Sequence, residues 1–411
     1  MILPQAALIP KRRSNERWGF KMAITGTSEK NTGRIRYGMV GGGQGAFIGA
    51  VHRLAARMDD HYEFVAGALS ADPVKSKASG EELGLSADRI YSDFKEMAKV
   101  EAKRKDGIEV ASIVTPNHMH FPVAKAFIEA GIHVICDKPL SLNLKEAKQL
   151  EALLKKHPKV IFALTHNYSG YPMIRQARAM VQAGELGEIR LVQGEYPQDW
   201  LATDLEKTGQ KQAAWRTDPK RSGAGGCVGD IGTHTYQLAT FVSGLTLDEI
   251  ACELTSFVKG RKLDDNVQAM LRFKGGAKGA IWASQVAVGN ENGLKLRVYG
   301  TKGGLEWTQA DPNYLWFTPY GEQKRLITRG GAGAGPAAAR VTRIPSGHPE
   351  GYLEGFANLY SEIAHAIKAH RAGKKPAKEV TFPGIEDGVQ GMAFIEACVK
   401  SSSKNGKWTK V

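Results

Sequence analysis

The sequence has only four cysteines, and no two of them are close enough to form a CxxC motif. Scattered thiols argue against a disulfide framework and favour a reducing, cytoplasmic compartment. The chain also lacks an apolar run of about 18 residues, which excludes a membrane-spanning helix. Zinc-finger spacing, basic heptads and aromatic RNA-binding motifs are absent as well, so nothing indicates a nucleic-acid-binding protein.

Acidic residues are in deficit: 42 Asp and Glu against 56 Lys and Arg give a formal net charge of +14. We expect a solvated basic surface that attracts anionic cofactors or substrates, without a nucleic-acid or membrane partner. Residues 1–33 are predicted to be a disordered basic extension. Their apolar stretch comes before the basic residues, which is the reverse of a signal peptide.

The length of 411 residues is enough for two domains. Strands and helices alternate over residues 34–167, which predicts a doubly wound parallel sheet. In residues 168–411, five strand-like segments follow one another without helices between them, and two long helices close the chain. This pattern predicts a second α/β domain with a large open, mainly antiparallel sheet.

A glycine-rich turn follows the first expected strand, Ile35–Val40, and precedes a helical pattern over Val51–Met58. This context is the one that a dinucleotide-binding motif requires. Either Gly41-x-Gly43-x-x-Ala46 is the motif, or Gly49 is its third glycine after a longer turn. The candidate cofactor contacts in the turn are Gly41, Gly43, Gln44, Ala46, Phe47 and Ile48.

An NAD site usually carries an acidic residue at the end of the second strand, where it holds the ribose hydroxyls. Ser70 stands at that place in this sequence. Asp72 precedes Pro73, so we interpret it as a helix cap. Ser70 with Lys75 leaves room for a 2′-phosphate, which slightly favours NADP over NAD.

Polar residues follow two further expected strands, Val110–Val114 and Ile132–Cys136. Ligands bind beyond the carboxyl ends of parallel strands, so these residues are expected near the nicotinamide. Lys138 could orient a hydroxyl or join a proton relay. The candidates are Thr115, Pro116, Asn117, His120, Asp137 and Lys138. His118 and His120 could suggest a metal site, but no further ligand is obvious, so we expect none.

Asp230 and His234 are spaced to share one face of a helix, just after a glycine turn. The carboxylate could hold substrate hydroxyls, and the histidine could exchange their proton. A capping Asp and a buried, hydrogen-bonded His are the alternative. Further candidates for substrate contact are His166, Tyr168, Tyr196, Trp215, Arg216 and His348.

Taken together, the glycine turn, Thr115-Pro116-Asn117-x-x-His120, Asp137-Lys138-Pro139 and Asp230-x-x-x-His234 resemble the Gfo/Idh/MocA oxidoreductases in order and spacing. The resemblance implies a Rossmann domain, an α/β domain whose open sheet often mediates oligomers, and hydride transfer between a sugar or polyol carbon and nicotinamide. It also implies catalytic roles for Lys138, Asp230 and His234. Asp137 replaces the family's usual Glu.

We therefore predict an NAD(P)-dependent sugar or polyol dehydrogenase that forms a homo-dimer or homo-tetramer. Two alternatives stay open. One is a glycosidase that oxidises its sugar transiently, and the other is a non-enzymatic sensor, which would not need the three proton-transfer residues.

Overall fold

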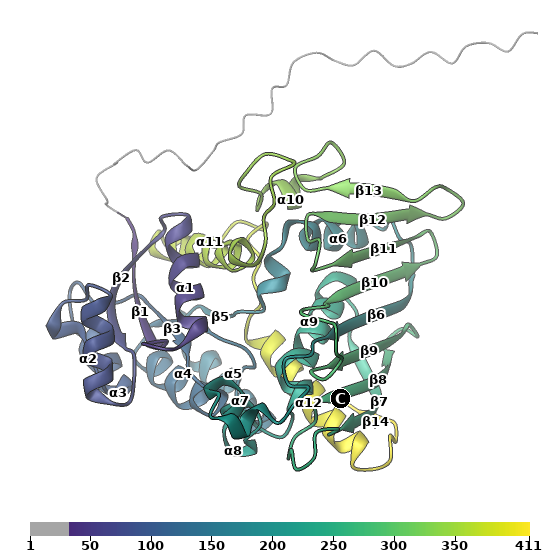
Figure 1. Ribbon diagram of the computed structural model, residues 1–411. Helices are drawn as coiled ribbons and strands as arrows, with labels where there is room; N and C mark the ends of the chain where they lie inside the picture. Colours follow the sequence, from purple (N-terminus) through teal and green to yellow (C-terminus); the bar gives the residue numbers. More distant parts are fainter. Residues whose placement is uncertain (1–32) are drawn as a thin grey trace, which may run out of the picture.

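Two β-sheets organise residues 33–411, the part of the chain that this computed structural model describes (Figure 1). The predicted extension lies outside the described residues, apart from Gly33. No helix among the described residues is both long and apolar enough to cross a membrane.

The first sheet has five parallel strands in the order β2-β1-β3-β4-β5. They are β1 (Ile35–Gly41), β2 (Tyr62–Ala68), β3 (Val110–Val114), β4 (His133–Cys136) and β5 (Phe162–Leu164). From β1 the chain adds β2 on one side and β3, β4 and β5 on the other side. The carboxyl ends of β1 and β3 therefore border the crevice where such sheets bind ligands. The predicted doubly wound parallel sheet is confirmed.

Helices cover both faces of this sheet. They are α1 (Phe47–Met58), α2 (Pro73–Glu82), α3 (Phe94–Glu101), α4 (His120–Glu129) and α5 (Leu144–Lys156). Met97, Phe127 and Leu150 bring α3, α4 and α5 into one apolar core. The Asp72 carboxylate accepts hydrogen bonds from the backbone N–H groups of Val74 and Lys75, which confirms its capping role.

The second sheet has nine strands in the order β13-β12-β11-β10-β6-β9-β8-β7-β14, all antiparallel except β6 with β9. They are β6 (Ile189–Pro197), β7 (Leu247–Thr255), β8 (Asn266–Phe273), β9 (Lys278–Ser284), β10 (Lys295–Gly300), β11 (Gly303–Thr308), β12 (Tyr314–Pro319), β13 (Arg325–Thr328) and β14 (Thr409–Lys410). The predicted open, mainly antiparallel sheet is confirmed, although the last three of these strands were not anticipated.

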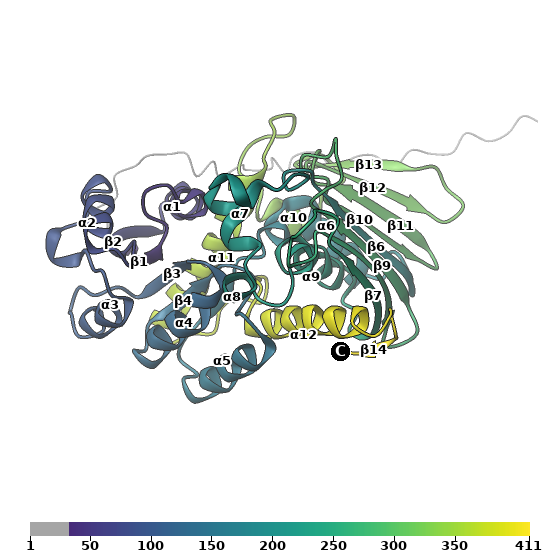
Figure 2. The same cartoon turned by 60° about the horizontal axis from the view of Figure 1, so that its bottom comes forward.

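Helices α6 (Pro172–Gln182), α9 (Thr233–Ser243) and α12 (Ile385–Ser402) lie against one face of the second sheet (Figures 1 and 2). The opposite face carries exposed apolar side chains, among them Leu191, Met270 and Trp316. Such a face suits association between copies of the chain. The homo-dimer or homo-tetramer stays a prediction.

Helix α11 (Tyr352–Arg371) belongs to the later part of the sequence but packs on the first sheet, beside α1 (Figure 1). Phe356, Tyr360 and Ile363 share an apolar core with Ile35 of β1 and Val51 of α1. A division of the chain at residue 167 does not anticipate this return. The face of the first sheet opposite α3, α4 and α5 is therefore closed by a helix made near the end of the chain.

A buried polar cluster lies inside this core. His52 of α1 is 0% exposed, and its Nδ1 is hydrogen-bonded to the hydroxyls of Tyr360, at 2.9 Å, and Ser112, at 3.2 Å. Burial lowers the pKa of His52 to about 4, although the Asp137 charge opposes the shift. The ring is therefore neutral at pH 7.

This cluster predicts that the protein loses stability in mild acid. His52 is protonated near pH 6.5 in the unfolded chain but only near pH 4 in the folded chain. Its contribution to the free energy of unfolding is therefore fully present above pH 6.5 and is lost as the pH falls toward 4. The shift corresponds to a loss of about 3 kcal/mol at most. Urea unfolding of the wild type and of His52→Gln at pH 7.5 and 5.0 measures this. Equal pH sensitivity in both proteins would exclude His52 as a source.

Candidate active site

A cleft of about 860 Å³ lies between the two halves of the molecule, at the carboxyl ends of β1 to β4. The predicted residues that line it are Gly41, Gly43, Gln44, Ala46, Phe47, Ile48, Ser70, Lys75, Thr115, Pro116, Asn117, Asp137, Lys138, Tyr168, Tyr196, Trp215, Arg216, Asp230 and His234. The first half of the chain thus supplies one wall. The end of β6, residues 198–221, residues 230–234 and the first turns of α11 supply most of the rest.

The glycine turn forms one end of the cleft. Gly41, Gly42 and Gly45 have positive φ angles, of 81°, 73° and 73°, which favour glycine. A Cβ at Gly49 would lie 2.4 Å from the Gly42 Cα, so Gly49 permits the close packing of α1 on the turn. This is the task of the third glycine in the motif. The contacts therefore favour the longer turn, with Ala46 as the residue preceding α1.

The turn leaves room for a diphosphate. The first turn of α1 has no acidic residue, and no side chain caps its amides. Nothing lies within 4 Å of a Cβ built at Gly45. Free amides at the start of a helix bind phosphate oxygens, so the turn fits a dinucleotide.

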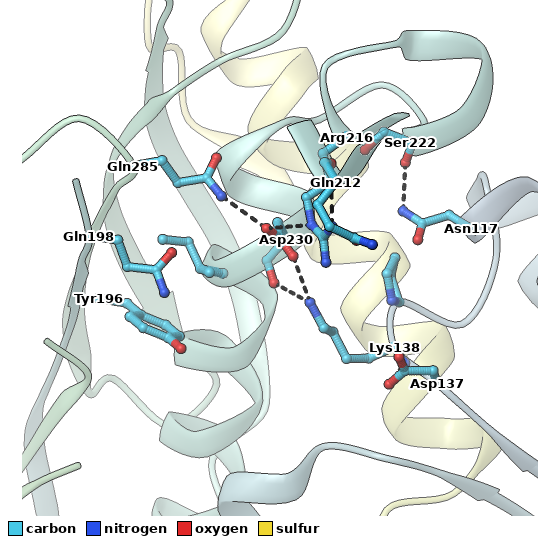
Figure 3. A network of polar contacts seen from close by, with 12 residues as sticks. Asn117, Asp137, Lys138, Tyr196, Gln198, Gln212, Arg216, Ser222, Asp230 and Gln285 are labelled. Atoms are coloured by element: carbon cyan, nitrogen blue, oxygen red, sulfur yellow. Dashed lines mark hydrogen bonds and ion pairs between the residues drawn. The ribbon is translucent and has the colours of Figure 1, made fainter. Parts of the chain in front are cut away.

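At the other end, Lys138 and Asp230 meet across the cleft (Figure 3). The Lys138 ammonium donates to Asp230 Oδ1 at 2.9 Å and to the Asp230 carbonyl at 2.7 Å. Gln285 donates to Asp230 Oδ2 at 2.9 Å, and Arg216 Nε lies 3.2 Å from the same oxygen without hydrogen-bond alignment. Burial would raise the pKa of Asp230, but the charges of Lys138 and Arg216 outweigh burial and hold it well below its usual range.

Asp230 lies in a π-helical turn, Val228–Gly232, that leads into α9. The buried Asp264 carboxylate accepts hydrogen bonds from the backbone amides of Gly226 and Val228, at 2.6 and 2.7 Å. A Cβ at Gly226 would lie 2.3 Å from the Asp264 carbonyl oxygen, so this position has room only for glycine. These contacts fix the backbone from which Asp230 points into the cleft.

His234 lies one turn further along, at the start of α9. Its ring packs edge-on against Tyr168 and His166, with centroids 5.0 and 5.6 Å away, and its Nδ1 has no hydrogen-bond partner within residues 33–411. Burial, Lys138 and His166 together hold the pKa of His234 well below its usual value. The imidazole is therefore neutral at pH 7 and able to accept a proton.

Comparisons with known proteins identify the family of both parts of the chain. The family model "Oxidoreductase family, NAD-binding Rossmann fold" matches residues 35–166, and "GFO/IDH/MocA C-terminal domain" matches residues 174–306. The chain belongs to the Gfo/Idh/MocA oxidoreductase family. The resemblance seen in the sequence is confirmed, and the first half of the chain is an NAD-binding Rossmann domain.

Three relatives of this family member span almost its whole length. An oxidoreductase structure from Sinorhizobium meliloti is 60% identical, with a TM-score of 0.84 and coverage of 92% of this chain and 99% of the other. The inositol dehydrogenase homolog from Azotobacter vinelandii, solved with NAD+, is 37% identical, with a TM-score of 0.88 and coverage of 92% and 98%. Levoglucosan dehydrogenase from Pseudarthrobacter phenanthrenivorans is 27% identical over 412 residues, 92% of this chain and 98% of the relative.

Three predicted residues lie outside the cleft walls of this oxidoreductase. The His120 ring is buried, with its nitrogens hydrogen-bonded to the carbonyls of Pro139 and Thr115 at 2.7 and 2.9 Å, so it joins the segments that follow β3 and β4 and does not line the cleft. His348 is exposed in the loop before α11 and does not line the cleft. His166 is buried behind His234, and burial with the Lys138 charge lowers its pKa to about 3.

Other residues of the site were not expected as contacts. Gln198, Gln210, Lys211, Gln212, Arg221 and Glu291 line the cleft. Gln198 directly follows β6, two residues after the predicted Tyr196, so its position in the sequence could have indicated it. Most of the others come from the irregular segment 198–222, whose sequence has no periodicity that would place it.

The packing at Gly49 predicts a loss of cofactor affinity in Gly49→Ala. The added Cβ must push the turn away from α1, since it would meet the Gly42 backbone at 2.4 to 2.9 Å. We expect the Kd for NAD+ to rise by about 10-fold or more, because the phosphate-binding amides lose their alignment. Calorimetric titration measures it, with Ala50→Ser on the exposed side of α1 as the control. An unchanged Kd would contradict this role of Gly49.

Proposed function

We propose that this oxidoreductase transfers a hydride between the carbinol carbon of a sugar or polyol and nicotinamide, with Lys138, Asp230 and His234 as its catalytic set. The observation that carries the proposal is the meeting of Lys138 and Asp230 across the cleft, with the neutral His234 beside them. The NAD+ complex of the inositol dehydrogenase homolog and the complex of levoglucosan dehydrogenase with NADH and levoglucosan support the same reaction class.

A dinucleotide held by the glycine turn and by the residues that follow β1 to β4 would supply the hydride acceptor. On the protein side, His234 takes the proton of the substrate hydroxyl as the C–H bond breaks. Lys138 uses two of its three N–H groups on Asp230, so one remains to donate to the substrate oxygen. That donor stabilises the negative charge that develops on the oxygen.

Asp230 acts on Lys138 in this proposal, and no hydrogen bond joins it to His234 within the described residues. Held by Lys138, Gln285 and Arg216, the carboxylate keeps the ammonium aimed into the cleft. Trp200 and Trp215 lie 5.8 and 4.3 Å from the Arg216 guanidinium and line the same region. Their rings offer an apolar surface to the C–H face of a sugar ring.

A panel of polyols and sugars, assayed with NAD+ and NADP+ by the absorbance of the reduced nicotinamide, tests the proposal. We expect at least one cyclic polyol or sugar to reduce the cofactor at a rate that depends on Lys138. Release of free sugar from a glycoside, with no net cofactor reduction, would instead identify the glycosidase alternative. Tight sugar binding without turnover would identify a sensor.

A further inference from the structure

Three cations from three separate elements line the cleft. Lys75 lies in the first turns of α2, directly after the β2 end where Ser70 and Ala71 also line the cleft. Lys211 begins α7 (Lys211–Arg216), and Arg221 lies in α8 (Pro219–Ser222). Figure 2 shows the two short helices between the first sheet and the second sheet.

None of the three makes an ion pair within residues 33–411, although 24 ion pairs of other Lys and Arg side chains occur there. Lys211 also lies within range of the positive charges of Lys75 and Arg221. Burial is the largest cause that lowers the pKa of Lys211, and the charges of Lys75 and then Arg221 lower it further. Unpaired like charges gathered in one cleft are unfavourable in the free protein, and an anion among them relieves the repulsion.

The short helices that carry Lys211 and Arg221 are fastened to both halves of the molecule. The Asn117 amide, from the end of β3, donates to the Ser222 carbonyl at 2.9 Å and holds α8 against the first domain. Arg216, at the end of α7, lies beside Asp230. The Gln210 side chain caps α7 by accepting from the Ala213 amide at 2.6 Å. The two cations are thus presented by a supported backbone.

We propose that Lys211 and Arg221, together with Lys75, bind a phosphate group of the dinucleotide from the second half of the chain. The phosphate is either the 2′-phosphate of NADP or the diphosphate that both dinucleotides share. The nearness of Lys75 to the β2 end, where the adenosine ribose is held in such folds, favours the 2′-phosphate. The inference depends on dinucleotide binding and not on which substrate is oxidised.

Calorimetric titration of wild type, Lys211→Met and Arg221→Met with NAD+, NADP+, ADP, AMP and 2′,5′-ADP tests the proposal without any assay of turnover. Because each cation makes a charge-assisted contact, we expect each substitution to weaken the relevant ligands about 10-fold or more. Loss confined to NADP+ and 2′,5′-ADP assigns the 2′-phosphate. Equal loss for NAD+, NADP+ and ADP, with AMP unchanged, assigns the diphosphate.

Lys220→Met is the matched control, because Lys220 is exposed, neighbours Arg221 and does not line the cleft. It removes the same charge and should leave every Kd unchanged. Arg221→Lys keeps the positive charge and should recover most of the affinity. It therefore distinguishes the loss of the charge from a misfolded α8 as the cause of weaker binding. Wild-type Kd values for all five ligands in Lys211→Met and Arg221→Met would overturn the proposal, and so would an equal loss in Lys220→Met.

Discussion

Replacing Lys138 by methionine should lower kcat/KM by about 10²- to 10³-fold, the usual effect of removing one donor to a developing oxyanion. Methionine keeps much of the side-chain volume but removes the ammonium that donates to Asp230 at 2.9 Å. The dinucleotide Kd should change little, because the loss concerns the reacting oxygen. Initial rates with the best substrate of the panel measure the effect.

The matched control is Lys148→Met, which removes an exposed ammonium on α5 far from the cleft. Asp230 keeps Gln285 and Arg216 in the Lys138 variant, so its carboxylate retains partners and the fold should persist. Calorimetric unfolding checks that point. A Lys138→Met protein that folds and turns over at the wild-type rate would remove Lys138 from the mechanism.

Replacing His234 by asparagine should lower kcat for alcohol oxidation by about 10²- to 10⁴-fold, the range for loss of a general base. Asparagine is polar but cannot take up the hydroxyl proton at neutral pH. His348→Asn is the control, since the same change falls on an exposed histidine outside the cleft. Equal rates in the two variants would exclude His234 as the base.

The pH dependence of kcat/KM tests the role of His234 as the base independently of the substitution. Oxidation needs the neutral imidazole, and burial holds the pKa of His234 well below its usual value of 6.5. The neutral form therefore persists as the pH falls, so the acid limb of kcat/KM should lie well below pH 6.5. This limb should be absent from the residual activity of His234→Asn. An acid limb at or above pH 6.5 in the wild type would point to another base.

Much of the site could be predicted from the sequence, because parallel strands end at one edge. Lys138 follows β4, and the glycine turn follows β1, so both had to lie near the crevice. Asp72 could be assigned as a cap because Asp followed by Pro begins a helix. These inferences needed only local chain direction and strand order.

The direction in which each side chain points could not be predicted from the sequence in the same way. His120 stands in the right motif, yet its ring turns toward the carbonyls of Thr115 and Pro139, which would otherwise be buried without donors. Lys211 and Arg221 reach the cleft through contacts such as Asn117 with Ser222, 105 residues apart. Such long-range contacts leave no periodic signal in the sequence.

The position of α11 near the end of the chain also determines when the core of the first sheet can be completed during translation. A ribosome completes β5 about 190 residues before it starts α11, an interval of roughly 10–40 s at ordinary translation speed. Throughout that time the nascent Rossmann sheet has one apolar face without its final cover, since Phe356, Tyr360 and Ile363 do not yet exist. The NAD-binding half of this protein can therefore complete this apolar core only when translation is nearly finished.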